Sequence, residues 1–174
     1  HLANSLAPMC AEGGLRIGDD TVMPKLLLVG RDEKRLSEIA RGNGVDAWTT
    51  DLDGALGDPD YQVYFDAAAS HMRAGILHRA LAAGKHIYAE KPVAPSVKDG
   101  LALLRDAQSR GLKHGVVEDK VNLPGLVKLA KLVDSGFFGR IVGFKLEFGW
   151  WVFDGISAPA QRPSWNYKRA TGGG

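Results

Sequence analysis

The stretch from Gly84 to Pro92, GKHIYAEKP, decides the fold. It predicts a glycine that ends a helix, a short apolar strand from His86 to Ala89, and then Glu90 and Lys91 before Pro92. In an open parallel sheet, ligands bind in the crevice beyond the carboxyl ends of the strands. A carboxylate and an ammonium at that edge are expected to face a ligand, and burial there lowers the pKa of an amine towards the working pH. The alternative is an exposed turn pair, and the tripeptide alone leaves both interpretations open.

The rest of the chain alternates between strand and helix patterns. Apolar runs at 25–29, 62–65 and 114–117 predict further strands. Ser70 is expected to cap the helix that Gly84 ends, and Ser96 with Asp99 forms a variant capping box for the next helix. This alternation predicts an α/β fold with a doubly wound parallel sheet.

The character of the chain changes after Pro124. A helix is expected to reach Asp134, and apolar residues then alternate with polar ones from Ile141 to Phe153. A period of two over such a length predicts a long half-buried strand, which suits a separate antiparallel sheet. We therefore predict two domains, residues 1–121 and 122–174, the second being the beginning of an α+β unit.

Three sequence features carry a family resemblance: AGKH at 83–86, the tripeptide Glu90-Lys91-Pro92, and SGFFGRI at 135–141. Together they resemble the Gfo/Idh/MocA family of nicotinamide-dependent sugar and cyclitol oxidoreductases, through nearly all of the chain. The resemblance implies a Rossmann-type NAD(P)-binding domain at 1–121 and a substrate-binding and oligomerisation domain from 122. The family's glycine-rich motif ends just before a His-Leu pair. Because this sequence starts at His1-Leu2, we expect the first strand and its glycines to lie outside it.

The end of the second strand carries a signal about the cofactor. An acid there normally accepts hydrogen bonds from the ribose hydroxyls of NAD, whereas an arginine accommodates the 2′-phosphate of NADP. Here Gly30 takes the place of the acid and Arg31 follows. This favours NADP over NAD. Asp32 is expected to cap the helix that follows, and it serves NAD if the turn is shifted. The alternative for Arg31 is an exposed residue beside that cap with no role in binding.

The resemblance also implies roles around the central turn. It places Lys91 as the catalytic residue that points at the substrate hydroxyl, while the backbone of Glu90, Lys91 and Pro92 braces the cofactor. Pro92 is a candidate for a cis peptide bond.

The family pattern Thr-Pro-Asn-x-x-His corresponds to residues 68–73, where the threonine, proline and histidine are all replaced. Ala68, Ala69 and Ser70 therefore remain candidate cofactor contacts through their backbone. The side-chain roles of the family do not carry over to Ala68, Ala69 or Arg73.

Candidate substrate residues follow later in the chain. Lys120, with Glu118 and Asp119, leaves the next strand on the same edge, and the alternative for these three is a solvated turn. Trp165 and Tyr167 are large aromatic residues that either stack on a sugar ring or fill a core or subunit interface. The resemblance places an aspartate and a histidine of the catalytic set beyond Gly174.

Composition limits the classes of partner. The chain has 174 residues, 45% hydrophobic and 24% charged, and a net charge of +2 without a basic block. This pattern argues against nucleic-acid and membrane partners and predicts a cytoplasmic protein. A single cysteine, Cys10, excludes an internal disulfide, and no metal site is predicted. A homodimer or homotetramer is expected to form through the second-domain sheet.

These observations lead to one functional hypothesis and two alternatives. The leading hypothesis is an NAD(P)-dependent oxidoreductase that transfers hydride between nicotinamide and a secondary alcohol of a sugar, polyol or cyclitol. The first alternative is a non-catalytic dinucleotide-binding sensor or regulator of the same fold. The second is an enzyme that uses NAD transiently, for glycoside cleavage or redox epimerisation.

Overall fold

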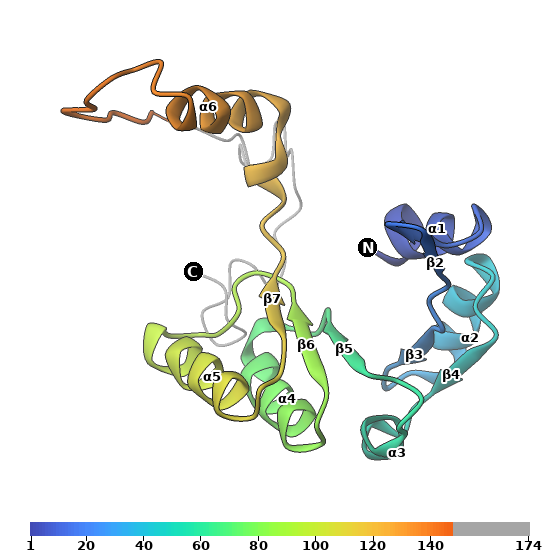
Figure 1. Ribbon diagram of the computed structural model, residues 1–174. Coiled ribbons are helices and arrows are strands. Elements are labelled where there is room, and N and C mark those ends of the chain that lie inside the picture. The colour runs from blue at the N-terminus through green and yellow to red at the C-terminus, as the bar shows by residue number, and fades with distance from the viewer. Residues whose placement is uncertain (148–174) are drawn as a thin grey trace, which may run out of the picture.

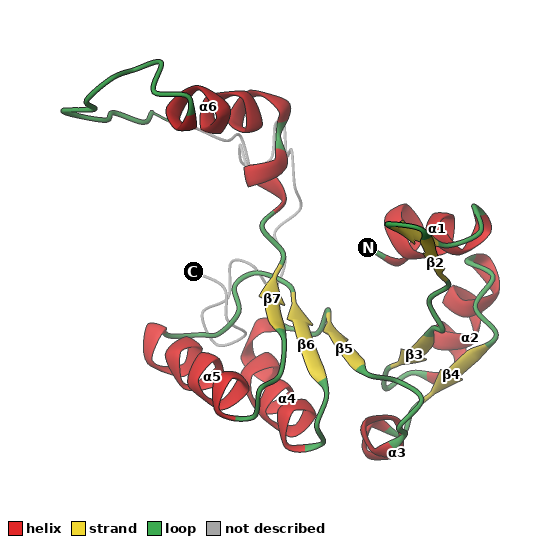
Figure 2. Cartoon of the chain, viewed as in Figure 1, coloured by secondary structure: helices red, strands yellow, loops and turns green. Residues whose placement is uncertain are grey.

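The computed structural model describes residues 1–147, and it is an alternating series of strands and helices (Figures 1 and 2). The elements, in chain order, are the π-helical turn η1 (Leu2–Leu6), α1 (Ala7–Ala11), β1 (Leu15–Ile17), β2 (Asp20–Val22), β3 (Leu27–Val29), α2 (Glu33–Gly42), β4 (Ala47–Thr49), α3 (Leu52–Gly57), β5 (Val63–Asp66), α4 (Ser70–Ala82), β6 (His86–Ala89), α5 (Val97–Ser109), β7 (His114–Val116), the 3₁₀ turn η2 (Asp119–Asn122) and α6 (Pro124–Asp134).

Two parallel sheets form the framework. One pairs β3 with β4, and the other has the order β5-β6-β7. These pairings correspond to the 2-3 and 4-5-6 portions of the doubly wound order 3-2-1-4-5-6. Among the described strands, none is hydrogen-bonded at position 1 between them. The predicted α/β class with parallel, Rossmann-type pairing is confirmed.

The register of the second sheet aligns the carboxyl ends of its strands. Asp66 of β5 pairs with Ala89 of β6, and Ala89 pairs with Val116 of β7. The residues that follow these three positions therefore emerge along one edge, as the sequence predicts for Glu90 and Lys91.

The helix ends follow local chemistry. Asp32 caps α2 by accepting a hydrogen bond from the amide of Arg35 at 3.0 Å. Ser96 Oγ accepts from the Asp99 amide at 3.1 Å and donates to the Asp99 carboxylate at 2.7 Å, which confirms the capping box. Gly84 follows α4 with φ +78°, a conformation that glycine adopts without the strain imposed by a Cβ atom.

A small apolar core joins α4 and α5 to the second sheet. Its buried members come from α4, β6 and α5, with one residue of α3: Leu77, Ala80, Leu81, Ile87, Ala89, Leu103, Ala107 and Leu56. In Figure 1, α4 and α5 lie side by side below this sheet, and they are in direct contact. This packing holds the β5-β6-β7 edge in place.

Two predictions were wrong, and one hairpin was not predicted. Ser70 is the first residue of α4 and not its cap; Ala69 is the N-cap, and Ser70 Oγ is buried without a hydrogen-bond partner among the described residues. Residues 141–147 carry no strand, since no described strand pairs with them, and 148–153 lie outside the described residues. The hairpin of β1 and β2 was missed because its strands are three residues long and exposed.

The C-terminal part of the described chain stands apart from the sheets. In Figure 1, α6 is separated from β7 by an extended connection. The boundary between residues 121 and 122 remains a prediction.

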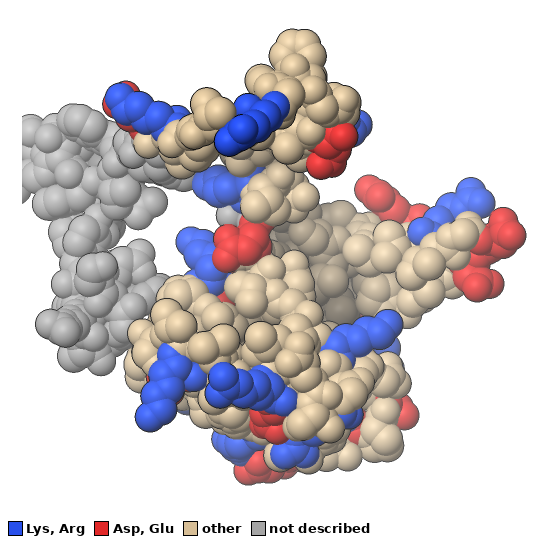
Figure 3. All heavy atoms as spheres, turned by 60° about the vertical axis from the view of Figure 1, so that its left-hand side comes forward, with Lys and Arg blue, Asp and Glu red and all other residues tan. Residues whose placement is uncertain are grey.

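Acidic and basic side chains are interspersed over the described part of the face seen in Figure 3. In the described part of the chain, no helix has the length and apolar character needed to cross a bilayer.

Candidate functional site

The predicted edge is formed by the loop after β5 and the turn after β6. The Glu90 amide donates to the Asp66 carbonyl at 2.9 Å, which extends the β5-β6 pairing by one step. The Lys91-Pro92 peptide bond is cis, as predicted. Glu90 Oε2 accepts from the Lys91 amide at 2.9 Å, so the glutamate side chain folds back on its own turn. Lys91 is exposed at this edge, so the burial that the sequence led us to expect for its amine is not found.

A buried guanidinium holds the two loops together. Arg73, in the first turns of α4, donates from Nε to Asp66 Oδ2 at 2.5 Å and from Nη2 to the Ala68 carbonyl at 2.6 Å. Its Nη1 donates to the Pro92 carbonyl. The Arg73 side chain is 3% exposed and that of Asp66 is 0% exposed, so this is a desolvated ion pair.

Tyr64 joins Asp66 and Arg73 in one hydrogen-bonded cluster. Tyr64 Oη donates to Asp66 Oδ1 at 3.3 Å, so both carboxylate oxygens have partners. Burial raises the pKa of the Tyr64 phenol, and the neighbouring Asp66 carboxylate raises it further because it disfavours a second negative charge. Tyr64 is therefore a neutral donor at ordinary pH. Sequence reasoning missed the cluster, and Arg73, in place of the family's histidine, was the available signal.

His1 also reaches this edge. Its ring lies 5.1 Å from that of Phe65, centroid to centroid, and its Nε2 pairs with Glu90 Oε1. His1 directly precedes η1. No sequence pattern indicates its pairing with Glu90.

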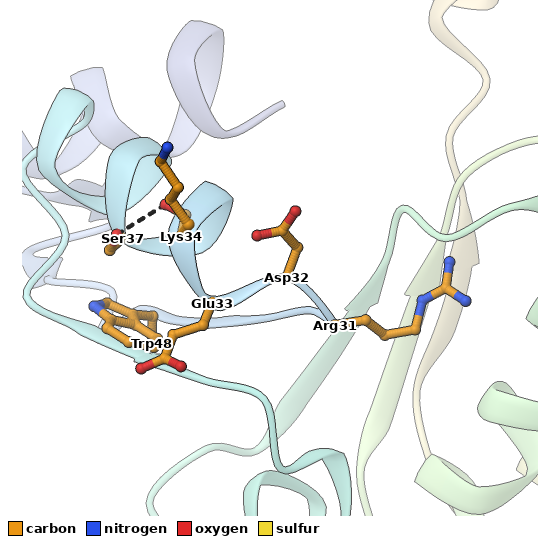
Figure 4. Close-up of a pocket in the computed structure, with 6 residues that line it drawn as sticks. All are labelled: Arg31, Asp32, Glu33, Lys34, Ser37 and Trp48. Carbon is orange, nitrogen blue, oxygen red and sulfur yellow. Dashed lines mark hydrogen bonds between the residues drawn. The ribbon is translucent and has the colours of Figure 1, made fainter.

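Apart from this edge, a surface hollow lies at the start of α2, on the β3-β4 sheet (Figure 4). It is an open space of about 740 Å³ lined by Arg31, Asp32, Glu33, Lys34, Ser37 and Trp48. Figure 4 shows that the Arg31 side chain extends away from Trp48 and Ser37. A Cβ atom at Gly30 would lie 3.0 Å from Leu36 Cδ2. Any side chain at position 30 therefore requires a small shift of the Leu36 side chain.

The remaining candidates are spread along the edge or lie outside the described residues. Ala68 and Ala69 are half-buried in the loop after β5, where the Ala68 carbonyl is already bound by Arg73. Lys120 is exposed in η2, beyond β7. Trp165 and Tyr167 lie outside the described residues. Among residues 1–147, no three His, Cys, Asp or Glu side chains are grouped so as to hold a metal ion.

Parallel pairing in the 2-3 and 4-5-6 parts of the doubly wound order, with a polar edge after β5 and β6, is the arrangement of the Rossmann class of dinucleotide-binding proteins. Residues 25–117 match the oxidoreductase family with an NAD-binding Rossmann fold, Gfo/Idh/MocA, and the chain belongs to that family. The resemblance stated from the sequence is confirmed.

Two curated relatives are sugar dehydrogenases by name. The chain is 47% identical over 175 residues to a D-xylose dehydrogenase of Paenarthrobacter nicotinovorans, covering 100% of this chain and 45% of that protein. It is 29% identical over 137 residues to a levoglucosan dehydrogenase of Pseudarthrobacter phenanthrenivorans, covering 79% of this chain and 34% of the relative. The chain thus spans less than half the length of these relatives.

Solved structures agree on the fold. Levoglucosan dehydrogenase in complex with NADH and levoglucosan matches with a TM-score of 0.67 at 26% identity, over 80% of this chain and 36% of that one. The apo form matches with a TM-score of 0.75 at 23% identity, over 99% of this chain and 43% of that one.

Proposed function

We propose that the protein is an NAD(P)-dependent oxidoreductase that moves hydride between nicotinamide and a secondary alcohol carbon of a sugar. One observation carries the proposal: Lys91 emerges from the carboxyl end of a parallel strand, on a cis-proline turn bonded to the neighbouring strand. The D-xylose and levoglucosan dehydrogenases among the relatives support a sugar over a cyclitol.

Oxidation of a secondary alcohol removes a hydride from carbon and a proton from oxygen. Bound nicotinamide supplies the hydride acceptor. We assign the removal of the hydroxyl proton to Lys91, whose Nζ hydrogen-bonds the hydroxyl and takes up or relays its proton. The turn contributes orientation, because the backbone bond from Glu90 to Asp66 ties the residue before Lys91 to β5.

We assign the hollow at the start of α2 to the adenosine end of the cofactor, with NADP favoured over NAD. Gly30 leaves no acid at the strand end, and Asp32 already caps α2 through its Oδ1. Arg31 adjoins this hollow and supplies the positive charge that a 2′-phosphate needs. An Arg31→Ala variant should lose NADP affinity and keep NAD affinity. Equal loss for the two cofactors contradicts the NADP assignment.

The test of the main proposal is a Lys91→Met variant of the protein, assayed with D-xylose and levoglucosan while following NAD(P)H absorbance. General acid-base groups typically contribute 10²- to 10⁴-fold, so kcat should fall by about that factor while cofactor Kd changes little. Lys113→Met is the matched control, because Lys113 is exposed and precedes β7, at the opposite end of that sheet's strands. Wild-type turnover by Lys91→Met would remove Lys91 from the mechanism.

A non-catalytic dinucleotide sensor remains the second candidate. The altered segment at 68–73 favours it, because Arg73 replaces the family's histidine and its hydrogen bonds go to Asp66 and to backbone carbonyls of the protein itself. Cofactor binding without turnover of any sugar or polyol would support the sensor. Cytoplasmic location and pairing of subunits through the second domain remain predictions.

A further inference from the structure

Arg73 bonds to three separate segments of the candidate site. Its three donor nitrogens reach the end of β5 at Asp66, the β5-α4 loop at Ala68 and the turn after β6 at Pro92. The last of these partners adjoins Lys91. We propose that Arg73 is the positioning residue that sets the placement of Lys91, a role that rests on the proposed function of that lysine.

The geometry brackets Lys91 from both sides. Glu90, the residue before it, is bonded through its amide to the Asp66 carbonyl at 2.9 Å. Pro92, the residue after it, is bonded through its carbonyl to Arg73, which is itself bonded to Asp66 Oδ2 at 2.5 Å. The residues on both sides of Lys91 are therefore bonded, directly or through Arg73, to Asp66 at the end of β5. The exposed Lys91 side chain itself makes no such bond to Asp66 or Arg73.

Only an arginine can make these three contacts at once. Its guanidinium carries five N–H donors in a rigid plane, whereas a lysine ammonium is a compact point donor on a flexible stem. The family pattern has a histidine at this position, and an imidazole offers at most two donors. Because the Arg73 side chain is 3% exposed, water does not substitute for a lost contact. The replacement of histidine by arginine thus adds a tether to the Lys91 turn.

The experiment compares Arg73→Lys with Arg79→Lys in the protein. Arg79 is on the same helix, and its ion pair with Asp53 is at the surface, so this control changes the same residue type without touching the turn. Three quantities are measured at a temperature where circular dichroism shows each variant folded. They are kcat, cofactor Kd, and hydrogen exchange of the backbone amides in the 90–94 turn, which are those of Glu90, Lys91, Val93 and Ala94 because Pro92 has no amide hydrogen.

For Arg73→Lys we expect kcat to fall by roughly 10- to 100-fold, the size of effect that a displacement of about 1 Å produces. Cofactor Kd should change by a smaller factor than kcat, because Arg73 holds the backbone of the turn and the loop without contacting the cofactor itself. Amide exchange at 90–94 should accelerate in this variant and stay unchanged in Arg79→Lys. If Arg73→Lys fails to fold, Arg73→His replaces it, with the same expected direction.

The outcomes separate the two proposals. If Lys91→Met loses turnover while a folded Arg73 variant keeps kcat within about twofold, the positioning role is wrong and the proposed function stands. Unchanged exchange at 90–94 would also overturn the positioning role. If Lys91→Met keeps its turnover, the proposed function fails, and the positioning role fails with it.

Discussion

Replacing Asp66 by alanine should destabilise the protein far more than an ordinary surface substitution. The carboxylate is 0% exposed and its partner Arg73 is 3% exposed, so the change leaves a buried guanidinium without its counter-charge. Removing one partner of a buried ion pair costs about 3–5 kcal/mol. The carbonyls of Ala68 and Pro92 remain as acceptors but carry no full charge, so we expect a value within that range.

The matched control is Asp53→Ala. Asp53 pairs with Arg79, which lies on α4 like Arg73. The Asp53 side chain is 82% exposed and that of Arg79 is 48% exposed. An exposed pair of this kind contributes about 0.2–1 kcal/mol. Urea unfolding at pH 7, followed by circular dichroism, measures both free energies, and an unchanged m value shows that the unfolded state is the same.

A double variant, Asp66→Ala with Arg73→Met, tests the electrostatic origin of the effect. Removing both charges should recover part of the lost stability, because no unpaired charge is then buried. Recovery should be incomplete, since the carbonyls of Ala68 and Pro92 lose their donor. If Asp66→Ala costs no more than Asp53→Ala, the cluster is not desolvated and the reasoning about Arg73 is wrong.

Three further predictions follow from local geometry. Ser96→Ala removes the acceptor for the Asp99 amide and should lower the free energy of unfolding by about 1 kcal/mol in a urea titration, whereas Ser96→Asn should retain most of it. Gly84→Ala meets no atom within 4 Å, so its cost is purely conformational at φ +78° and should be about 1–2 kcal/mol by the same assay; a neutral effect would show that the backbone relaxes. Hydrogen bonding to Arg110 lowers the pKa of Asp106, so its contribution to stability is present above the unfolded pKa, near 4, and is lost as pH falls. The difference in urea midpoint between wild type and Asp106→Asn should therefore shrink from pH 7 to pH 3, and a constant difference would contradict the assignment.

Features that depend on neighbouring residues could be predicted from the sequence. The strand His86–Ala89 and the helix Pro124–Asp134 have the predicted bounds. The caps at Asp32 and Ser96 and the glycine after α4 also match. The two caps rest on a side chain bonding to an amide three residues away, and the glycine rests on the freedom of a single φ angle; both are properties of a short peptide.

Features that depend on distant segments were decided by the tertiary structure. The guanidinium of Arg73 meets Asp66 and Pro92 only because the β5-β6 register brings two strand ends to one level. Residues 141–147 have the alternation of a strand but no described partner strand, and an alternating pattern indicates a buried face without supplying the neighbour that completes it. The sequence by itself therefore determined the family, the alternation of strands and helices in an α/β fold, and the edge that carries Lys91. Which charges are buried beneath that edge depends on long-range packing, because desolvation and pairing arise only once the strands have assembled.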